Sequence, residues 1–168
     1  MKYQIGRDVI EIAGSDTTDS IEKCPLEFFV PGPARAKQSF RYGARGHNYT
    51  SARVKAWQAD VGWAAQQAIH KLDSNSFPLS GDVAVDLIFL LKDNRRIDCD
   101  NLSKAVLDSL NGITWDDDKQ TIDLHPRKFI VPSEESGVYV IIKETTPDLN
   151  LLAEICRRIQ LLKKENQA

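Results

Sequence analysis

The stretch RRIDCDNLSKAVLDSLNGITWDDDKQ, from Arg95 to Gln120, decides how this chain is expected to fold. Its middle part, from Asn101 to Leu110, predicts a helix, because apolar residues recur three and four positions apart. The pair Asn111-Gly112 is a typical helix end, since glycine adopts the left-handed backbone conformation at little cost. Either Asp100 or Asn101 is expected to cap the helix start. The prediction therefore centres on a helix with an acidic loop at each side.

Extended segments flank this helix. Val83–Leu91 alternates between two largely apolar faces, which is typical of a strand covered on both sides. Beyond the acidic loop, Thr121–Val131 and Val138–Lys143 are expected to be strands, and the turn PSEESG between them predicts a hairpin. Pro126 indicates a bulge or an edge position in the first of these two strands.

The first half of the chain predicts one strand and one helix. Leu26–Val30 is expected to be a short strand that PGP at 31–33 ends, and residues 34–49 follow as a loop. A helix begins at Thr50 or Ser51, with the hydroxyl as its cap. Its apolar positions recur at three and four: Val54, Trp57, Val61, Ala64, Ala65, Ala68 and Leu72.

The predicted order is β-α-β-α-β-β with a terminal helix, an α+β fold in which helices pack on one small mixed sheet. We expect an acidic N-terminal arm at 1–24, one domain at 25–146 and an amphipathic C-terminal helix at 147–168. The helix has a narrow apolar seam, made of Leu152, Ile155, Ile159 and Leu162. Such a seam either docks on its own domain or forms a short coiled-coil contact with a second subunit.

Composition excludes several classes of protein. A chain of 168 residues with 42% hydrophobic and 27% charged residues is ordinary for a soluble domain. Its apolar runs are too short to span a membrane, and the polar N-terminus does not match a signal peptide. The three cysteines form no CxxC pair, which argues against a disulfide framework or a zinc knuckle. We therefore expect a cytoplasmic protein with no membrane partner.

The net charge of −2 is unevenly distributed. Residues 28–59 contain no acid, whereas residues 1–27 carry six acids and three bases. The basic residues of the acid-free segment are Arg35, Lys37, Arg41, Arg45, Arg53 and Lys55. This segregation predicts a face that attracts phosphate groups, with a solvated basic loop as the alternative.

The acids of the central stretch suggest metal chemistry. Asp98 and Asp100 lie two residues apart, and an extended backbone there would project both carboxylates to one side. Lys104 lies four residues beyond Asp100, above the first turn of the helix. A helix of ten residues is about 15 Å long. The loop that follows it would therefore have to run back along the helix for Asp118 to meet Asp98.

Clustered carboxylates repel one another unless a cation lies between them. Mg²⁺ prefers carboxylate and phosphate oxygens, and it can activate water for attack on a phosphodiester. For either acidic motif alone, the structural alternative is a helix cap or a solvated turn.

At these residues the chain resembles the RusA family of Holliday junction resolvases, which phages and prophages largely encode. The matching motifs are FFVPGPARAKQSFR, YTSARVKAWQ, NRRIDCDNLSKAVLDSLNG and WDDDKQ, and the resemblance runs from about Leu26 to Lys143. It implies metal ligands at Asp98, Asp100 and Asp118, with Asp117 as the other acid of the pair, and an essential lysine at Lys104. Asp116 is an additional acid, and it leaves the register of the last ligand open.

The resemblance also implies a homodimer that binds four-way junction DNA and makes paired symmetric nicks with Mg²⁺, for which Mn²⁺ is expected to substitute. The two-fold symmetry of a junction independently favours two sites related by a two-fold axis. The residues expected to contact DNA are Lys37, Arg41, Arg45, Arg53, Arg95 and Arg96. Ile97 departs from the family, in which a basic residue can precede the first aspartate. The alternatives are a branched-DNA-binding protein without catalysis and a Mg²⁺-dependent nuclease for other branched DNA.

Overall fold

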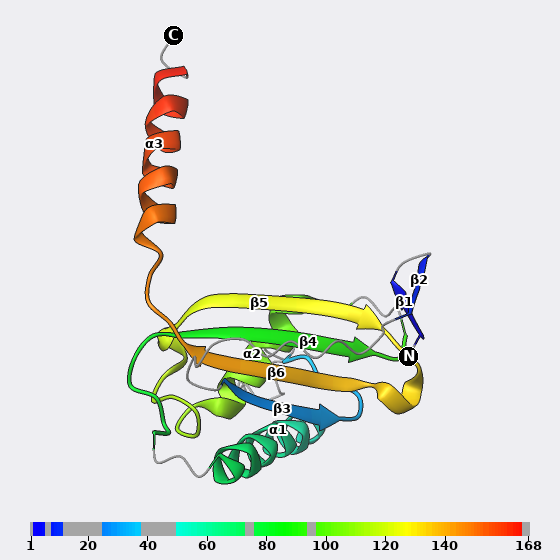
Figure 1. Cartoon of the computed structure of the whole chain (residues 1–168). Coiled ribbons are helices and arrows are strands. Elements are labelled where there is room, and N and C mark those ends of the chain that lie inside the picture. Colours follow the sequence, from blue (N-terminus) through cyan, green and yellow to red (C-terminus); the bar gives the residue numbers. More distant parts are fainter. Residues whose placement is uncertain are drawn as a thin grey trace, which may run out of the picture.

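The computed structural model describes residues 2–5, 8–11, 25–37, 50–72, 76–93 and 97–165. Its main element is a four-stranded mixed sheet in the order β3-β6-β4-β5, which confirms the predicted α+β class (Figure 1). The sheet and its helices are built from β3 (Leu26–Pro31), α1 (Ala52–Lys71), β4 (Val83–Leu91), α2 (Cys99–Leu110), η1 (Asp118–Gln120), β5 (Thr121–Ile130), η2 (Ser133–Glu135) and β6 (Gly137–Glu144). A terminal helix, α3 (Leu149–Glu165), follows.

The predicted hairpin between the last two strands is wrong. β6 lies between β3 and β4 and is antiparallel to both, whereas β5 runs parallel to β4 at the edge of the sheet. β4 is an inner strand, hydrogen-bonded to β5 along one edge and to β6 along the other, so β5 and β6 are separated and cannot form a hairpin. Pro126 lies in the edge strand β5, where its missing N–H costs little, as predicted.

Helices α1 and α2 cover one face of the sheet. Every second side chain of β4, from Val83 to Leu91, points to this face and is buried in the core with residues of the two helices. Ser51 caps α1 as predicted, since its hydroxyl oxygen accepts from the N–H of Val54 at 3.4 Å. The buried α1 positions are Val54, Trp57, Val61, Gly62 and Ala65. Burial of this apolar stripe anchors the helix on the sheet.

Helix α2 forms the connection between the parallel strands β4 and β5. It ends at Leu110, and Gly112 takes a φ of +72° in the turn that follows, as the Asn111-Gly112 pair predicts. Its start lies earlier than predicted, because Cys99 is already helical and Asp98 occupies the N-cap position. Neither Asp100 nor Asn101 is therefore the cap.

The two ends of the chain add further elements. Part of the segment predicted as an arm forms a two-stranded antiparallel sheet of β1 (Lys2–Ile5) and β2 (Asp8–Glu11), which its composition did not predict. At the other end, α3 stands away from the sheet (Figure 1). Among the described residues, no helix has both the length and the apolar character to cross a membrane.

Candidate functional site

The first acidic group lies at the start of α2. Asp98 has an extended backbone, with φ −69° and ψ 134°, and its carboxylate makes no capping hydrogen bond to the helix. It accepts instead from the side-chain amide of Asn101 at 3.3 Å. The Asp98 side chain is exposed, and its carboxylate does not cap the helix.

Asp100 and Lys104 lie one turn apart on α2, and both side chains are exposed. Residues four positions apart occupy the same side of a helix, so the amino group of Lys104 and the carboxylate of Asp100 share one surface. The prediction that an extended backbone projects Asp98 and Asp100 to the same side is wrong, because Asp100 already lies in the helix. Asp98, Asp100 and Lys104 nevertheless all lie at the start of α2.

The second acidic group is the turn that precedes β5. Asp117 caps η1 by accepting from the backbone N–H of Lys119 at 3.0 Å. This hydrogen bond is the main reason why the pKa of Asp117 lies below its usual value, and the Lys119 amino group at 3.2 Å acts in the same direction. Asp118, the first residue of η1, is exposed.

Gln120 holds this acidic turn in place. Its side-chain oxygen accepts from the backbone N–H groups of Asp116 and Asp117 at 2.9 and 3.0 Å. Its side-chain nitrogen donates to the backbone oxygens of Leu79 and Gly81 at 2.9 and 2.8 Å. The amide thus ties the turn to the segment before β4. The sequence prediction assigned no role to Gln120, although it lies in the quoted WDDDKQ motif.

Replacing Gln120 with alanine removes all four of these hydrogen bonds. We expect the free energy of unfolding to fall by about 2 kcal/mol, since each net hydrogen bond contributes about 0.5–1.5 kcal/mol and the losses are not additive. Chemical denaturation of both proteins measures the difference. Lys119→Ala is the matched control, because the Lys119 side chain is 80% exposed. Equal unfolding free energies for Gln120→Ala and the control would show that the four hydrogen bonds of Gln120 do not stabilise the fold.

The two acidic groups lie at opposite ends of the β4-α2-β5 unit. The Lys128 amino group donates to the backbone oxygen of Ile97 at 2.7 Å, so the residue before Asp98 lies beside Lys128. Lys128 comes seven residues after Thr121, where β5 begins and the acidic turn ends. Seven residues of strand span about 23 Å. Asp98 and Asp118 of one chain are therefore far beyond the reach of one ion, whose oxygen ligands lie within about 2.6 Å of it.

A family model, Endodeoxyribonuclease RusA, matches residues 31–143, more than half of the chain. The chain belongs to the RusA family. This confirms the resemblance drawn from the sequence motifs. The family match includes both acidic groups and Lys104, and it excludes β1, β2 and α3. No curated protein matches the chain.

The described acids of this RusA-family chain lie in two separate groups. Among the described residues, no group of three or more His, Cys, Asp or Glu side chains could hold a metal ion. The expected return of the loop along α2 does not occur, because η1 leads directly into β5 at the far end of the helix. A single chain therefore offers two separate groups of acids.

The residues predicted to contact DNA differ in their surroundings. Arg53 is exposed in the first turn of α1. Lys37 is paired with Asp108 of α2, and its backbone N–H donates to the backbone oxygen of Asn101 at 3.0 Å. Lys37 therefore fastens its segment to α2 in the free protein. The remaining predicted contacts, Arg41, Arg45, Arg95 and Arg96, lie outside the described residues.

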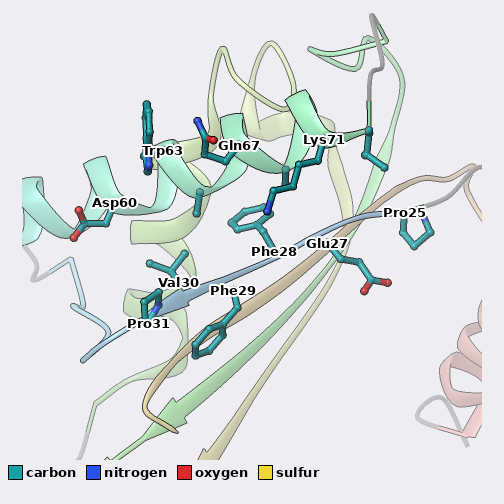
Figure 2. Close-up of a pocket in the computed structure, with 13 residues that line it drawn as sticks. Pro25, Glu27, Phe28, Phe29, Val30, Pro31, Asp60, Trp63, Gln67 and Lys71 are labelled. Carbon is teal, nitrogen blue, oxygen red and sulfur yellow. The ribbon is translucent and has the colours of Figure 1, made fainter. Parts of the chain in front are cut away.

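A groove of about 790 Å³ lies between β3 and α1 (Figure 2). Phe29 projects from β3 and Trp63 from α1, and their side chains are 42% and 64% exposed. The predicted catalytic residues do not line this groove. Its shape is thus not evidence about the nuclease chemistry.

Proposed function

We propose that this protein is a Mg²⁺-dependent homodimer that resolves Holliday junctions by paired symmetric nicks. The observation that carries the proposal is the RusA-family match across a segment that contains both acidic groups and Lys104. Asp98, Asp100 and Asp118 are the proposed metal ligands, with Asp117 as a supporting acid. We further propose that the protein acts in recombination and repair of DNA. Its proposed location is the cytoplasm.

The separation of the acids supports a site shared between two chains. Asp98 and Asp100 of one subunit would share an ion with Asp118 of the partner subunit. A two-fold axis would then create two equivalent sites, because an isologous contact is made twice. This arrangement gives one dimer two active sites, as symmetric cleavage of a four-way junction requires.

Each proposed residue has a distinct part in the chemistry. A divalent cation, when bound, supplies a Lewis acid that neutralises charge on the scissile phosphate. The carboxylates hold the cation, and the turn that carries Asp118 is fixed by the Gln120 amide. Lys104, exposed beside Asp100, adds a positive charge where negative charge develops during cleavage.

We propose that DNA affinity comes from basic residues of the chain. We propose Arg53 and the four arginines at positions 41, 45, 95 and 96 as phosphate contacts, and Lys37 as a contact once its ion pair with Asp108 opens. Contacts of this kind release counterions, so junction binding should weaken steeply as the salt concentration rises. The overall charge of −2 does not prevent this, because the acids and the bases occupy different segments.

Cleavage of labelled four-way junction and linear duplex, with Mg²⁺ or with EDTA, tests the proposal. We expect symmetric nicks in the junction with Mg²⁺, weaker cutting of the duplex, and no cutting with EDTA. Mn²⁺ should restore cleavage after chelation. Cutting that continues in EDTA would contradict metal dependence. Preferred cutting of flaps would favour the other branched substrates, and binding without cutting would favour a non-catalytic protein.

A further inference from the structure

Helix α3 leaves its apolar side uncovered. The side chains of residues 149–160 are all exposed, and the larger apolar ones retain between 44% and 70% of their surface. They are Leu149, Leu151, Leu152, Ile155, Ile159 and Leu162. An isolated helix of 17 residues is only marginally stable in water, and uncovered leucines add to the cost. The predicted docking of this seam on its own domain is therefore not observed among the described residues.

The spacing of the seam fits another helix. Leu152, Ile155, Ile159 and Leu162 follow the three-four-three pattern of coiled-coil core positions over two heptads. A stripe this narrow matches a single partner helix better than the broad face of a sheet.

The distribution of charge along α3 favours one direction of pairing between two copies of the helix. Residues 148–154 carry Asp148 and Glu154 and no base, whereas residues 155–165 carry four bases and only Glu165 as an acid. Two copies in parallel would place the basic halves together. Two antiparallel copies in the register of the seam bring Asp148 of each chain near Lys163 and Lys164 of the other, whereas Arg157 and Arg158 lie near their own counterparts. The antiparallel arrangement also opposes the helix dipoles favourably.

We propose that α3 pairs with α3 of a second copy of this chain as an antiparallel coiled coil. In this arrangement Leu152 of one chain packs against Leu162 of the other, and Ile155 packs against Ile159. The proposal does not rest on nuclease activity, because α3 lies outside the family match.

Site-specific cross-linking of the full-length chain tests the direction. Cys24, Cys99 and Cys156 are replaced by serine, and Leu149→Cys or Lys163→Cys is then added in separately tagged chains. These two positions flank the same side of the seam. With a short bismaleimide, we expect the mixed 149–163 product to exceed both like-with-like products. An excess of the 149–149 product would overturn the antiparallel arrangement.

A pair of charge substitutions tests the seam itself. Ile155→Asp with Ile159→Asp should reduce the mixed product at least about tenfold, because two buried apolar contacts are lost in each helix. Ala153→Asp with Gln160→Asp is the matched control, since it adds the same charge on the opposite side and should change the yield less than about twofold.

Two outcomes would overturn the pairing. One is equal loss of the mixed product in the seam variant and in the control. The other is no mixed product at all in the cysteine-substituted full chain. If removal of residues 148–168 also changes the tryptophan fluorescence of the chain, but not that of a Trp63→Phe variant, α3 would instead lie in the groove between β3 and α1. Neither outcome bears on DNA cleavage, so the proposed function is tested separately.

Discussion

We expect Asp98→Asn to abolish junction cleavage while junction binding is kept or becomes tighter. The substitution removes a proposed metal ligand and one negative charge near the phosphates. Metal stabilisation of such a reaction amounts to several kcal/mol, so the rate should fall on the order of 1,000-fold. Single-turnover cleavage and a gel-shift titration measure the two effects.

The fold should tolerate this substitution. Asp98 is exposed and makes no capping hydrogen bond to α2, so we expect the unfolding free energy to change by less than about 1 kcal/mol. Asp60→Asn is the matched control, because it removes the same charge from an exposed acid of α1 that lies outside both acidic groups. Cleavage by Asp98→Asn at the rate of this control would refute the assignment of Asp98.

We expect a heterodimer of Asp98→Asn and Asp118→Asn chains to recover cleavage, although each variant alone should be inactive. If each site takes Asp98 and Asp100 from one chain and Asp118 from the other, both defects fall in the same site. The second site is then intact. The expected rate is about half of the wild-type nicking rate, since one of two equivalent sites remains. The product should be a singly nicked junction.

Differently tagged chains, co-expressed and purified through both tags, provide this heterodimer. A heterodimer of Asp98→Asn and Asp100→Asn is the control. Its defects fall in different sites, so it should stay inactive. Restored cleavage in both heterodimers, or in neither, would rule out an active site shared between the two chains.

The sequence predicted local structure better than it predicted strand neighbours. Ser51, Gly112 and the apolar spacing of α1 act over a few residues, and each has the predicted role. The place of β6 depends on contacts distant in sequence. Its backbone pairs with the second edge of β4, and the short turn after β5 gave no sign of this.

The candidate site was predictable as a set of residues but not as an arrangement. The motifs that contain Asp98 and Asp118 are visible in the sequence, and the family match covers them. Their separation follows from the parallel pairing of β4 with β5, which requires α2 to carry the chain back along the sheet. Gln120 was missed because its partners are backbone groups of a distant segment, Leu79 and Gly81.

The β4-α2-β5 unit has a kinetic consequence for the proposed enzyme. A rigid helix and strand keep the two halves of the active site apart in every isolated chain. At low concentration a lone subunit could therefore occupy a junction without breaking it, and the initial rate would rise with the square of the protein concentration. Stray single breaks in the genome would be suppressed by dilution alone, with no separate inhibitor.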